Sequence, residues 1–259
     1  MFIDTHAHLN ARQFAEDADS VIENARQNGI SSMIVVGFDR ETIAKAIELA
    51  EKHEAIYAAI GWHPVDAVTC TDTDLLWIEE LALSSDLVVA IGEIGLDYYW
   101  DTSSPEIQET IFRKQIRLAK KLDLPIVIHN RDATEDLVRV LKEEDAGVVG
   151  GVMHCFSGSV ETVQQCLDMG FYISIAGPVT FKNAKKLKDV AQYVPIDRLV
   201  LETDCPYLTP EPFRGKRNEP AYVRYIAEEI ARLRGISVAA LAEATTANAQ
   251  RIFKLDSSS

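Results

Sequence analysis

Eight short apolar runs alternate with amphipathic segments along this 259-residue chain, and this alternation restricts the fold more than any other feature. The runs are mostly β-branched or aliphatic and apolar on both faces, which is typical of parallel strands covered by helices. We predict strands at Phe2–Asp4, Ser32–Val36, Ile56–Ile60, Val88–Ile91, Ile126–His129, Gly151–His154, Tyr172–Ile175 and Leu199–Glu202.

The segments between these runs carry helical patterns. Apolar residues recur at helical spacing over 107–122 and again over 223–233. Ser104-Pro105 and Asp39 favour helix starts. Gly29, Gly147 and Gly170 stand where helices are expected to end.

Strands that alternate with helices indicate an α/β protein, here a single (β/α)8 TIM-type barrel over residues 1–255 with a frayed tail at 256–259. The alternative is an open, doubly wound sheet. That fold commonly carries a GxGxxG fingerprint after its first strand, and no such fingerprint is present. The pattern therefore favours the barrel.

The composition limits the classes of function that this chain can have. A net charge of −14 argues against a protein that coats nucleic acid, but bound divalent ions can reverse the local charge of an acidic site, so a nuclease is not excluded. No apolar run approaches the ~20 residues that span a bilayer, and the amino-terminal residues lack a signal-peptide pattern. The four cysteines show no CxxC spacing. We expect a cytoplasmic protein with reduced thiols, no membrane contact and no obligate protein partner.

The polar residues best suited to catalysis or metal binding lie at the carboxyl ends of predicted strands. They are His6 and His8 after the first strand, His63 after the third, Glu93 after the fourth, His129 at the end of the fifth, His154 at the end of the sixth, and Glu202 and Asp204 at the eighth. In a barrel these ends converge on one rim, where active sites are found. Five of the six histidines are in this set, which favours a functional centre over a structural scatter.

Spacing and ligand chemistry point to a metal centre. His6 and His8 are two residues apart, so in an extended segment they face the same way, as do Glu202 and Asp204. A lone HxH pair is equally compatible with a structural role, but the combined set is not. Imidazole with carboxylate suits Zn, Mn, Fe or Mg. Six ligand candidates exceed the need of one tetrahedral ion, so we expect two ions bridged by Glu93.

Other residues fit a phosphate-containing substrate. The fourth strand carries a glutamate where many related barrels use a carboxylated lysine, which favours phosphoester over amide hydrolysis. Arg131 is expected to hold a phosphate oxygen. Ser157 precedes a predicted helix, Arg214 belongs to a basic loop at 214–218, and Tyr98 can stack on a base. A helix cap, a solvated surface and core packing are the respective alternatives.

Over nearly its full length the chain resembles the TatD family of metal-dependent deoxyribonucleases. The motifs that carry the resemblance are Phe2–Asn10, Gly61–Pro64, Gly92–Tyr98, Pro125–Glu135, His154–Gly158 and Leu199–Pro206. No candidate ligand departs from the pattern of this family. The resemblance implies a TIM-type barrel with two divalent ions, with Mg in use and Mn or Zn as alternatives. One ion would be held by His6, His8, Glu93 and Asp204, the other by Glu93, His129 and His154.

The resemblance also implies nuclease activity, often 3′→5′ exonucleolytic on single-stranded DNA or RNA, with the strand end bound transiently. By this hypothesis Asp204 accepts a proton from the attacking water and Glu202 orients the site or shares that role. His63 and Arg131 contact the scissile phosphate. Some relatives are instead D-aminoacyl-tRNA deacylases, so a metal-dependent ester or amide hydrolase is the main alternative. A catalytically silent binding module is a third.

Overall fold

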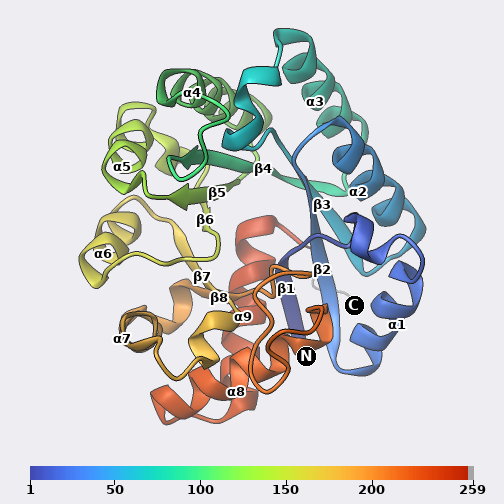
Figure 1. The fold of residues 1–259 in the computed structure, drawn as a ribbon, viewed down its shortest axis with the longest axis vertical. Coiled ribbons are helices and arrows are strands. Elements are labelled where there is room, and N and C mark those ends of the chain that lie inside the picture. Colours follow the sequence, from blue (N-terminus) through green and yellow to red (C-terminus); the bar gives the residue numbers. More distant parts are fainter. Residues whose placement is uncertain (256–259) are drawn as a thin grey trace.

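The computed structural model describes residues 1–255, and the expected tail at 256–259 lies outside the described residues. Eight strands form one parallel sheet in the order in which they occur in the chain. They are β1 (Phe2–Ala7), β2 (Ile30–Gly37), β3 (Ile56–Ile60), β4 (Val88–Asp97), β5 (Ile126–Arg131), β6 (Gly151–Met153), β7 (Tyr172–Ile175) and β8 (Leu199–Leu201). A bridge between Ala7 and Cys205 joins the segment after β8 to β1, and the predicted (β/α)8 barrel is confirmed (Figure 1).

The α-helices of the described chain surround this sheet. They are α1 (Ala18–Gln27), α2 (Arg40–Lys52), α3 (Asp72–Ser84), α4 (Pro105–Leu122), α5 (Thr134–Glu143), α6 (Val160–Asp168), α7 (Lys185–Tyr193), α8 (Val223–Arg234) and α9 (Val238–Phe253). Figure 1 looks along the barrel and shows α1 to α8 around its outside, with α9 behind it. Within residues 1–255 no helix combines the length and apolarity that crossing a bilayer requires.

Local chemistry explains where several helices begin and end. The side chain of Asp39 accepts a hydrogen bond from the backbone N–H of Thr42, and the side chain of Thr42 accepts one from the backbone N–H of Asp39. This capping box begins α2 where it was predicted. The side chain of Ser104 accepts a hydrogen bond from the backbone N–H of Ile107 and so caps α4, without a bond in return. Gly147 does not end a helix, contrary to expectation, because α5 has already ended at Glu143 and Gly147 lies in a 3₁₀ turn.

The predicted strand ends differ from the observed ones at the rim. β1 continues to Ala7, so His6 lies inside this strand rather than after it. β4 was expected to stop before Gly92 but continues to Asp97, so Glu93 is also inside a strand. The extension pairs with β5, which lies more than thirty residues further along the chain. That pairing overrides the local tendency of glycine to end a strand.

Two apolar layers hold the barrel. The outer layer lies between strands and helices, and the predicted stripes on α4 and α8 contribute to it, although Ile107 is exposed at the start of α4. The inner layer contains Val127, Val152 and Val200 and is completed by Phe253 of α9. Because side chains alternate along a strand, the residues two positions further on also point inward. These are His129, His154 and Glu202, so the polar site continues the interior rows of the barrel.

Candidate metal centre

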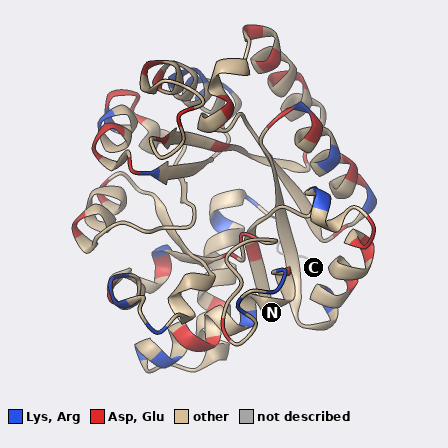
Figure 2. Ribbon diagram, in the orientation of Figure 1, with Lys and Arg blue, Asp and Glu red and all other residues tan. Residues whose placement is uncertain are grey.

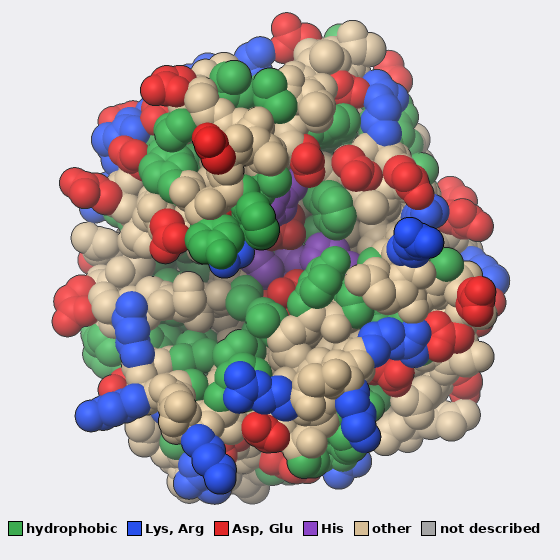
Figure 3. Space-filling model, viewed as in Figure 1, with side chains coloured by type: hydrophobic (Ala, Val, Ile, Leu, Met, Phe, Trp, Pro, Cys, Tyr) green, Lys and Arg blue, Asp and Glu red, His purple; other side chains and the backbone are tan. Residues whose placement is uncertain are grey.

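The predicted polar residues meet at the carboxyl ends of the strands, at the base of an open pocket of about 520 Å³. Figure 3 shows the histidines on the floor of this opening. Predicted residues that line the pocket are His8, His63, Glu93, His129, His154, Asp204 and Arg131. The side chains of His6 and Glu202 are fully buried and both contact His154, the first by ring stacking and the second by a hydrogen bond.

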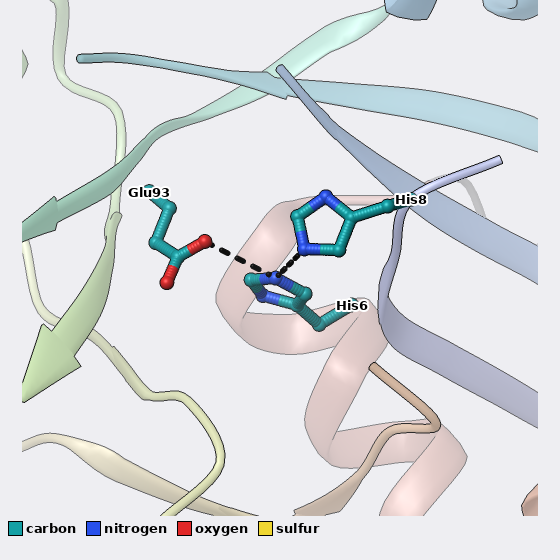
Figure 4. A group of neighbouring side chains, drawn as sticks. All are labelled: His6, His8 and Glu93. Carbon is teal, nitrogen blue, oxygen red and sulfur yellow. Dashed lines mark hydrogen bonds and ion pairs between the residues drawn. The ribbon is translucent and has the colours of Figure 1, made fainter. Parts of the chain in front are cut away.

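The first cluster forms around the two histidines of the amino-terminal motif. The Nε2 atoms of His6 and His8 lie 3.1 Å apart. Oδ1 of Asp204 is 3.3 Å from Nε2 of His8 and 3.7 Å from Nε2 of His6. Oε2 of Glu93 is 3.5 Å from Nε2 of His6 (Figure 4). Two imidazole nitrogens and two carboxylate oxygens therefore surround one point, which is a donor set suited to a divalent cation.

The second cluster lies on the other side of the same glutamate. Oε1 of Glu93 is 2.7 Å from Nδ1 of His129 and 2.9 Å from Nε2 of His154. The two carboxylate oxygens of Glu93 thus face different clusters. A carboxylate in this position can hold two cations close together, which is the arrangement that two-metal hydrolases use.

Asp204 reaches the first cluster because of the local backbone at the seam between β8 and β1. Its φ is 55°, in the left-handed region, and its N–H donates to the carbonyl of His6 at 2.9 Å. The N–H of His8 in turn donates to the carbonyl of Cys205 at 2.8 Å. These bonds hold Asp204 and the two histidines in one rigid unit.

Three of the four histidines in the two clusters have a hydrogen-bond acceptor behind the ring. Nδ1 of His8 lies 3.3 Å from the carbonyl oxygen of Val36, Nε2 of His129 lies 2.8 Å from Oδ2 of Asp97, and Nδ1 of His154 lies 3.1 Å from Oε1 of Glu202. Carboxylates and carbonyls only accept, so a ring that binds a cation keeps its single proton on the rear nitrogen. The nitrogen that faces the pocket is then free to bind a cation, as in other histidine metal sites.

His63 has the opposite tautomer. Its Nδ1 accepts a hydrogen bond from the backbone N–H of Val65 at 3.1 Å, so the neutral ring carries its proton on Nε2. That nitrogen lies 3.5 Å from Oε1 of Glu93. His63 therefore presents a hydrogen-bond donor to the pocket, whereas the histidines of the two clusters present acceptors.

Asp97 belongs to the centre, although it is not among the residues predicted from the sequence. It is 1 % exposed and contacts His129 across the β4–β5 pair. Its Oδ1 also accepts hydrogen bonds from the N–H groups of Tyr99 and Trp100, so it joins the metal centre to the loop above it. The sequence signal for Asp97 is its position four residues after Glu93, within the motif Gly92–Tyr98.

The pKa values reflect a compact group of opposite charges. Burial raises the pKa of the Glu93 carboxyl, but the imidazoles of His154, His63 and His129 outweigh this and hold it well below its ordinary value. Burial lowers the pKa of His154, yet Glu93 and Glu202 raise it well above the usual value. Burial and the neighbouring His154 together lower the pKa of His6. The Glu93 carboxyl is therefore ionised at the base of the open pocket.

The donor set fits divalent cations. In the described chain, Nδ1 of His6 and Oε2 of Glu202 are buried without a hydrogen-bond partner, so the polar groups are not satisfied by one another alone. No lysine or arginine forms an ion pair with Glu93, Asp204 or Glu202 within residues 1–255. Cations are the missing counterpart of such a cluster.

The predicted substrate contacts divide into two groups. Arg131 lines the pocket, and its guanidinium carbon lies 3.6 Å from the ring centroid of Tyr99. Trp100 and Tyr207 also line it and are half exposed at its mouth. Arg131 therefore lies at the pocket beside the aromatic rings of Tyr99 and Trp100.

The other three do not line the pocket. Tyr98 donates its hydroxyl proton to Asp136 at the start of α5, at 2.9 Å, and its half-buried ring packs against the outer apolar layer. Ser157 is exposed, and the helix cap is provided by Ser159. Arg214 lies over the ring of Phe181, 4.3 Å from its centroid.

Comparisons with known proteins identify the family. The model of the family "TatD related DNase" matches residues 3–254. The uncharacterized metal-dependent hydrolase YabD of Bacillus subtilis is 58% identical over 99% of this chain and 100% of its own length. The 3′-5′ ssDNA/RNA exonuclease TatD of Erwinia tasmaniensis is 36% identical, over 97% of this chain and 99% of its own.

A solved structure gives the same result. The TatD homolog YjjV from Escherichia coli K12 superposes with a TM-score of 0.93 at 32% identity, covering 98% of both chains. The fold, the clustered histidines and carboxylates, and these relatives lead to one conclusion: the chain belongs to the TatD-related DNase family and is a metal-dependent hydrolase.

Proposed function

We propose that this protein is a divalent-metal-dependent phosphodiesterase that removes nucleotides from the 3′ end of single-stranded DNA, with RNA as a second polymer. The observation that carries the proposal is Glu93, whose two carboxylate oxygens face separate histidine clusters at the base of one pocket. The name of the Erwinia tasmaniensis relative, a 3′-5′ ssDNA/RNA exonuclease, supports the choice of substrate.

Two ions would be held at this centre. His6, His8, Glu93 and Asp204 would hold one, and Glu93, His129 and His154 the other. Bound there, divalent ions neutralise charge on a phosphoryl group and lower the pKa of an attacking water. We favour Mg in use, as the family resemblance implies, and Mn or Zn as substitutes, which the imidazole nitrogens of the site also suit.

The residues of the chain supply the remaining functions. Asp204 is suited to accept a proton, because its Oδ1 lies near both histidines of the first cluster and its side chain lines the pocket. Glu202 holds Nδ1 of His154 and so orients the second cluster. His63 donates from Nε2 to a phosphate oxygen, and Arg131 holds a second oxygen of the same group.

A single strand suits the mouth of the pocket better than a duplex. Trp100 is 53 % exposed and Tyr207 is 51 % exposed, and both line the opening. Exposed aromatic rings stack on unpaired bases, each worth about 1–3 kcal/mol. Bases of a duplex are already stacked on one another and are not available for such contacts.

The proposal is tested with a panel of 5′-labelled single-stranded and double-stranded oligonucleotides and Mg, Mn or Zn. We expect single strands to shorten one nucleotide at a time from the 3′ end. D-aminoacyl-tRNA is included under the same conditions, because the same ions could hydrolyse a carboxyl ester. Deacylation without cleavage of any oligonucleotide would identify the ester hydrolase instead, and no reaction with any metal would refute both activities.

Replacement of the proton acceptor gives a sharper test. Asp204→Asn should reduce kcat by at least ~100-fold, the usual contribution of a positioned proton acceptor, while the fold is retained. Asp66→Asn is the matched control, because Asp66 lines the same pocket but belongs to neither cluster. Near-normal turnover by Asp204→Asn, or equal losses in both variants, would contradict the role given to Asp204.

A further inference from the structure

Five exposed cations lie together on one side of the pocket and form what we call the basic ridge: Lys182, Lys185, Lys186, Arg214 and Lys216. None of them takes part in an ion pair within the described residues, whereas many other cations of the chain do. Lys182 lies in the loop after β7, Lys185 and Lys186 begin α7, and the other two lie in the loop after β8.

The two loops are joined to each other. The N–H of Glu211 donates to Oγ1 of Thr180 at 2.9 Å, which links the loop after β8 to the loop after β7. Arg214 lies over the ring of Phe181 in the neighbouring loop. The cations therefore stand on one connected surface rather than on two independent segments.

This surface adjoins the metal pocket. Both loops leave the carboxyl ends of barrel strands, which is the face on which the pocket opens. The loop after β8 also contains Tyr207, a residue of the pocket wall. The carbonyl oxygen of Tyr207 accepts a hydrogen bond from the side chain of Asn218, at the far end of that loop. A polymer leaving the pocket on the side of Tyr207 would meet the basic ridge.

The ridge contrasts with the charge of the whole molecule. The chain has 40 acidic and 26 basic side chains, yet the first turn of α7 contains no acidic residue. Figure 3 shows Lys and Arg side chains gathered below the opening, where Figure 2 places α7 and the loop after β8, and more Asp and Glu above it. Such an asymmetric field attracts a polyanion to one side of the pocket.

We propose that the basic ridge binds the phosphodiester backbone of a single nucleic-acid strand, several nucleotides away from the end held at the metal centre. The inference rests on the proposed nuclease function and adds a second contact region to it. The cations supply the affinity for a long strand, and the metal centre acts on its terminus. A substrate of one or two nucleotides would not reach the ridge.

The test compares long and short substrates in two variants of equal charge. Lys182→Gln/Lys186→Gln/Lys216→Gln removes three ridge cations. The control Lys45→Gln/Lys121→Gln/Lys254→Gln removes three exposed lysines elsewhere, on α2, α4 and the residue after α9. For each protein, kcat/KM is measured on a 20-nucleotide single strand and on bis-p-nitrophenyl phosphate, and the ratio of the two is taken.

We expect the ratio to fall about 10- to 100-fold in the ridge variant and to change little in the control. Three lost phosphate contacts change the slope of log affinity against log salt concentration by about 2 for a single strand. Near 0.1 M salt, a change of this size in the slope corresponds to an affinity loss of about 10- to 100-fold. The slope should become shallower by that amount only in the ridge variant. An unchanged ratio, or equal falls in both variants, would overturn the inference.

Direct binding separates this inference from the proposed function. Fluorescence anisotropy of a labelled 20-nucleotide strand is measured with Mg in an Asp204→Asn background, with and without the ridge substitutions. Weaker binding with the ridge substitutions supports the basic ridge as a binding surface. Failure of the wild-type protein to cleave any oligonucleotide would refute the nuclease function but not this binding result. Active cleavage with ridge-independent binding would refute the ridge alone.

Discussion

At the scale of single residues, the candidate metal centre depends on hydrogen bonds made behind the side chains proposed as ligands. A neutral imidazole carries one proton, so an acceptor behind the ring decides which nitrogen can face a cation. His129 and His154 each have a carboxylate in this position, Asp97 and Glu202 respectively. His63 instead has a backbone N–H beside Nδ1, which makes its Nε2 a donor. Identical side chains at one rim are thereby suited to two different tasks.

Asp97 should therefore act as a positioning residue for the second cluster. Asp97→Ala removes the acceptor for Nε2 of His129 and should weaken metal binding by about 10- to 100-fold, the usual effect of losing such a partner. Asp97→Asn, which keeps a carbonyl acceptor, should recover part of the loss. Titration calorimetry with Mn and the unfolded fraction by circular dichroism are the measurements. Unchanged metal affinity in folded Asp97→Ala would contradict this role.

At the scale of secondary-structure elements, the contact between β4 and β5 brings Glu93 and His129 together. Gly95 pairs with His129 across this contact and has a φ of 147°, which side chains rarely adopt. A Cβ atom there would overlap the carbonyl oxygen of His129. The close approach of the two strands, and with it the 2.7 Å distance between Glu93 and His129, thus requires a glycine.

Gly95→Ala should separate β4 from β5 and lower metal affinity as well as stability. Gly29→Ala is the matched control, because Gly29 also has a positive φ of 85° but its added methyl group would meet no atom within 4 Å. We expect a loss of about 1 kcal/mol in the control from backbone strain alone, and more in Gly95→Ala. Urea unfolding and Mn binding measure the two effects. Equal behaviour of the variants would show that the overlap is relieved without cost.

At the scale of the whole molecule, the candidate metal centre draws its groups from β1, β4 and β5 and from the segments that follow β1, β6 and β8. These parts are far apart in the chain, and an unfolded chain cannot present them together. Ligands that bind only the folded state stabilise it by mass action. Bound cations would also relieve the crowding of carboxylates in a molecule with a net charge of −14.

Metal removal should lower the unfolding temperature. A metal concentration 100 times its Kd stabilises the folded state by about 2.7 kcal/mol, which raises Tm by about 5–10 °C for a protein of this size. Scanning calorimetry with EDTA and then with excess Mn measures the difference. Glu93→Ala, which removes the shared carboxylate, should lose most of this shift, and Asp66→Asn should keep it. A wild-type protein with the same Tm in EDTA and Mn would count against a bound ion.

The sequence by itself determined the architecture and the location of the site. Strands buried on both faces have a continuous apolar pattern, and eight of them alternating with helices specify the barrel. The carboxyl ends of parallel strands meet at one rim, so His6, His129 and Asp204 could be placed together without a structure. This inference needed only local patterns and one topological rule.

Tertiary structure decided the contacts between those residues. The pairing of β4 with β5 extends β4 beyond Gly92 and brings Asp97 against His129, thirty-two residues away. The hydroxyl of Tyr98 bonds to Asp136 outside the pocket, and two loops join to form the basic ridge. Side-chain orientation and ring protonation depend on neighbours that are distant in the chain. Local sequence patterns carry no information about those neighbours, so only the folded structure could supply them.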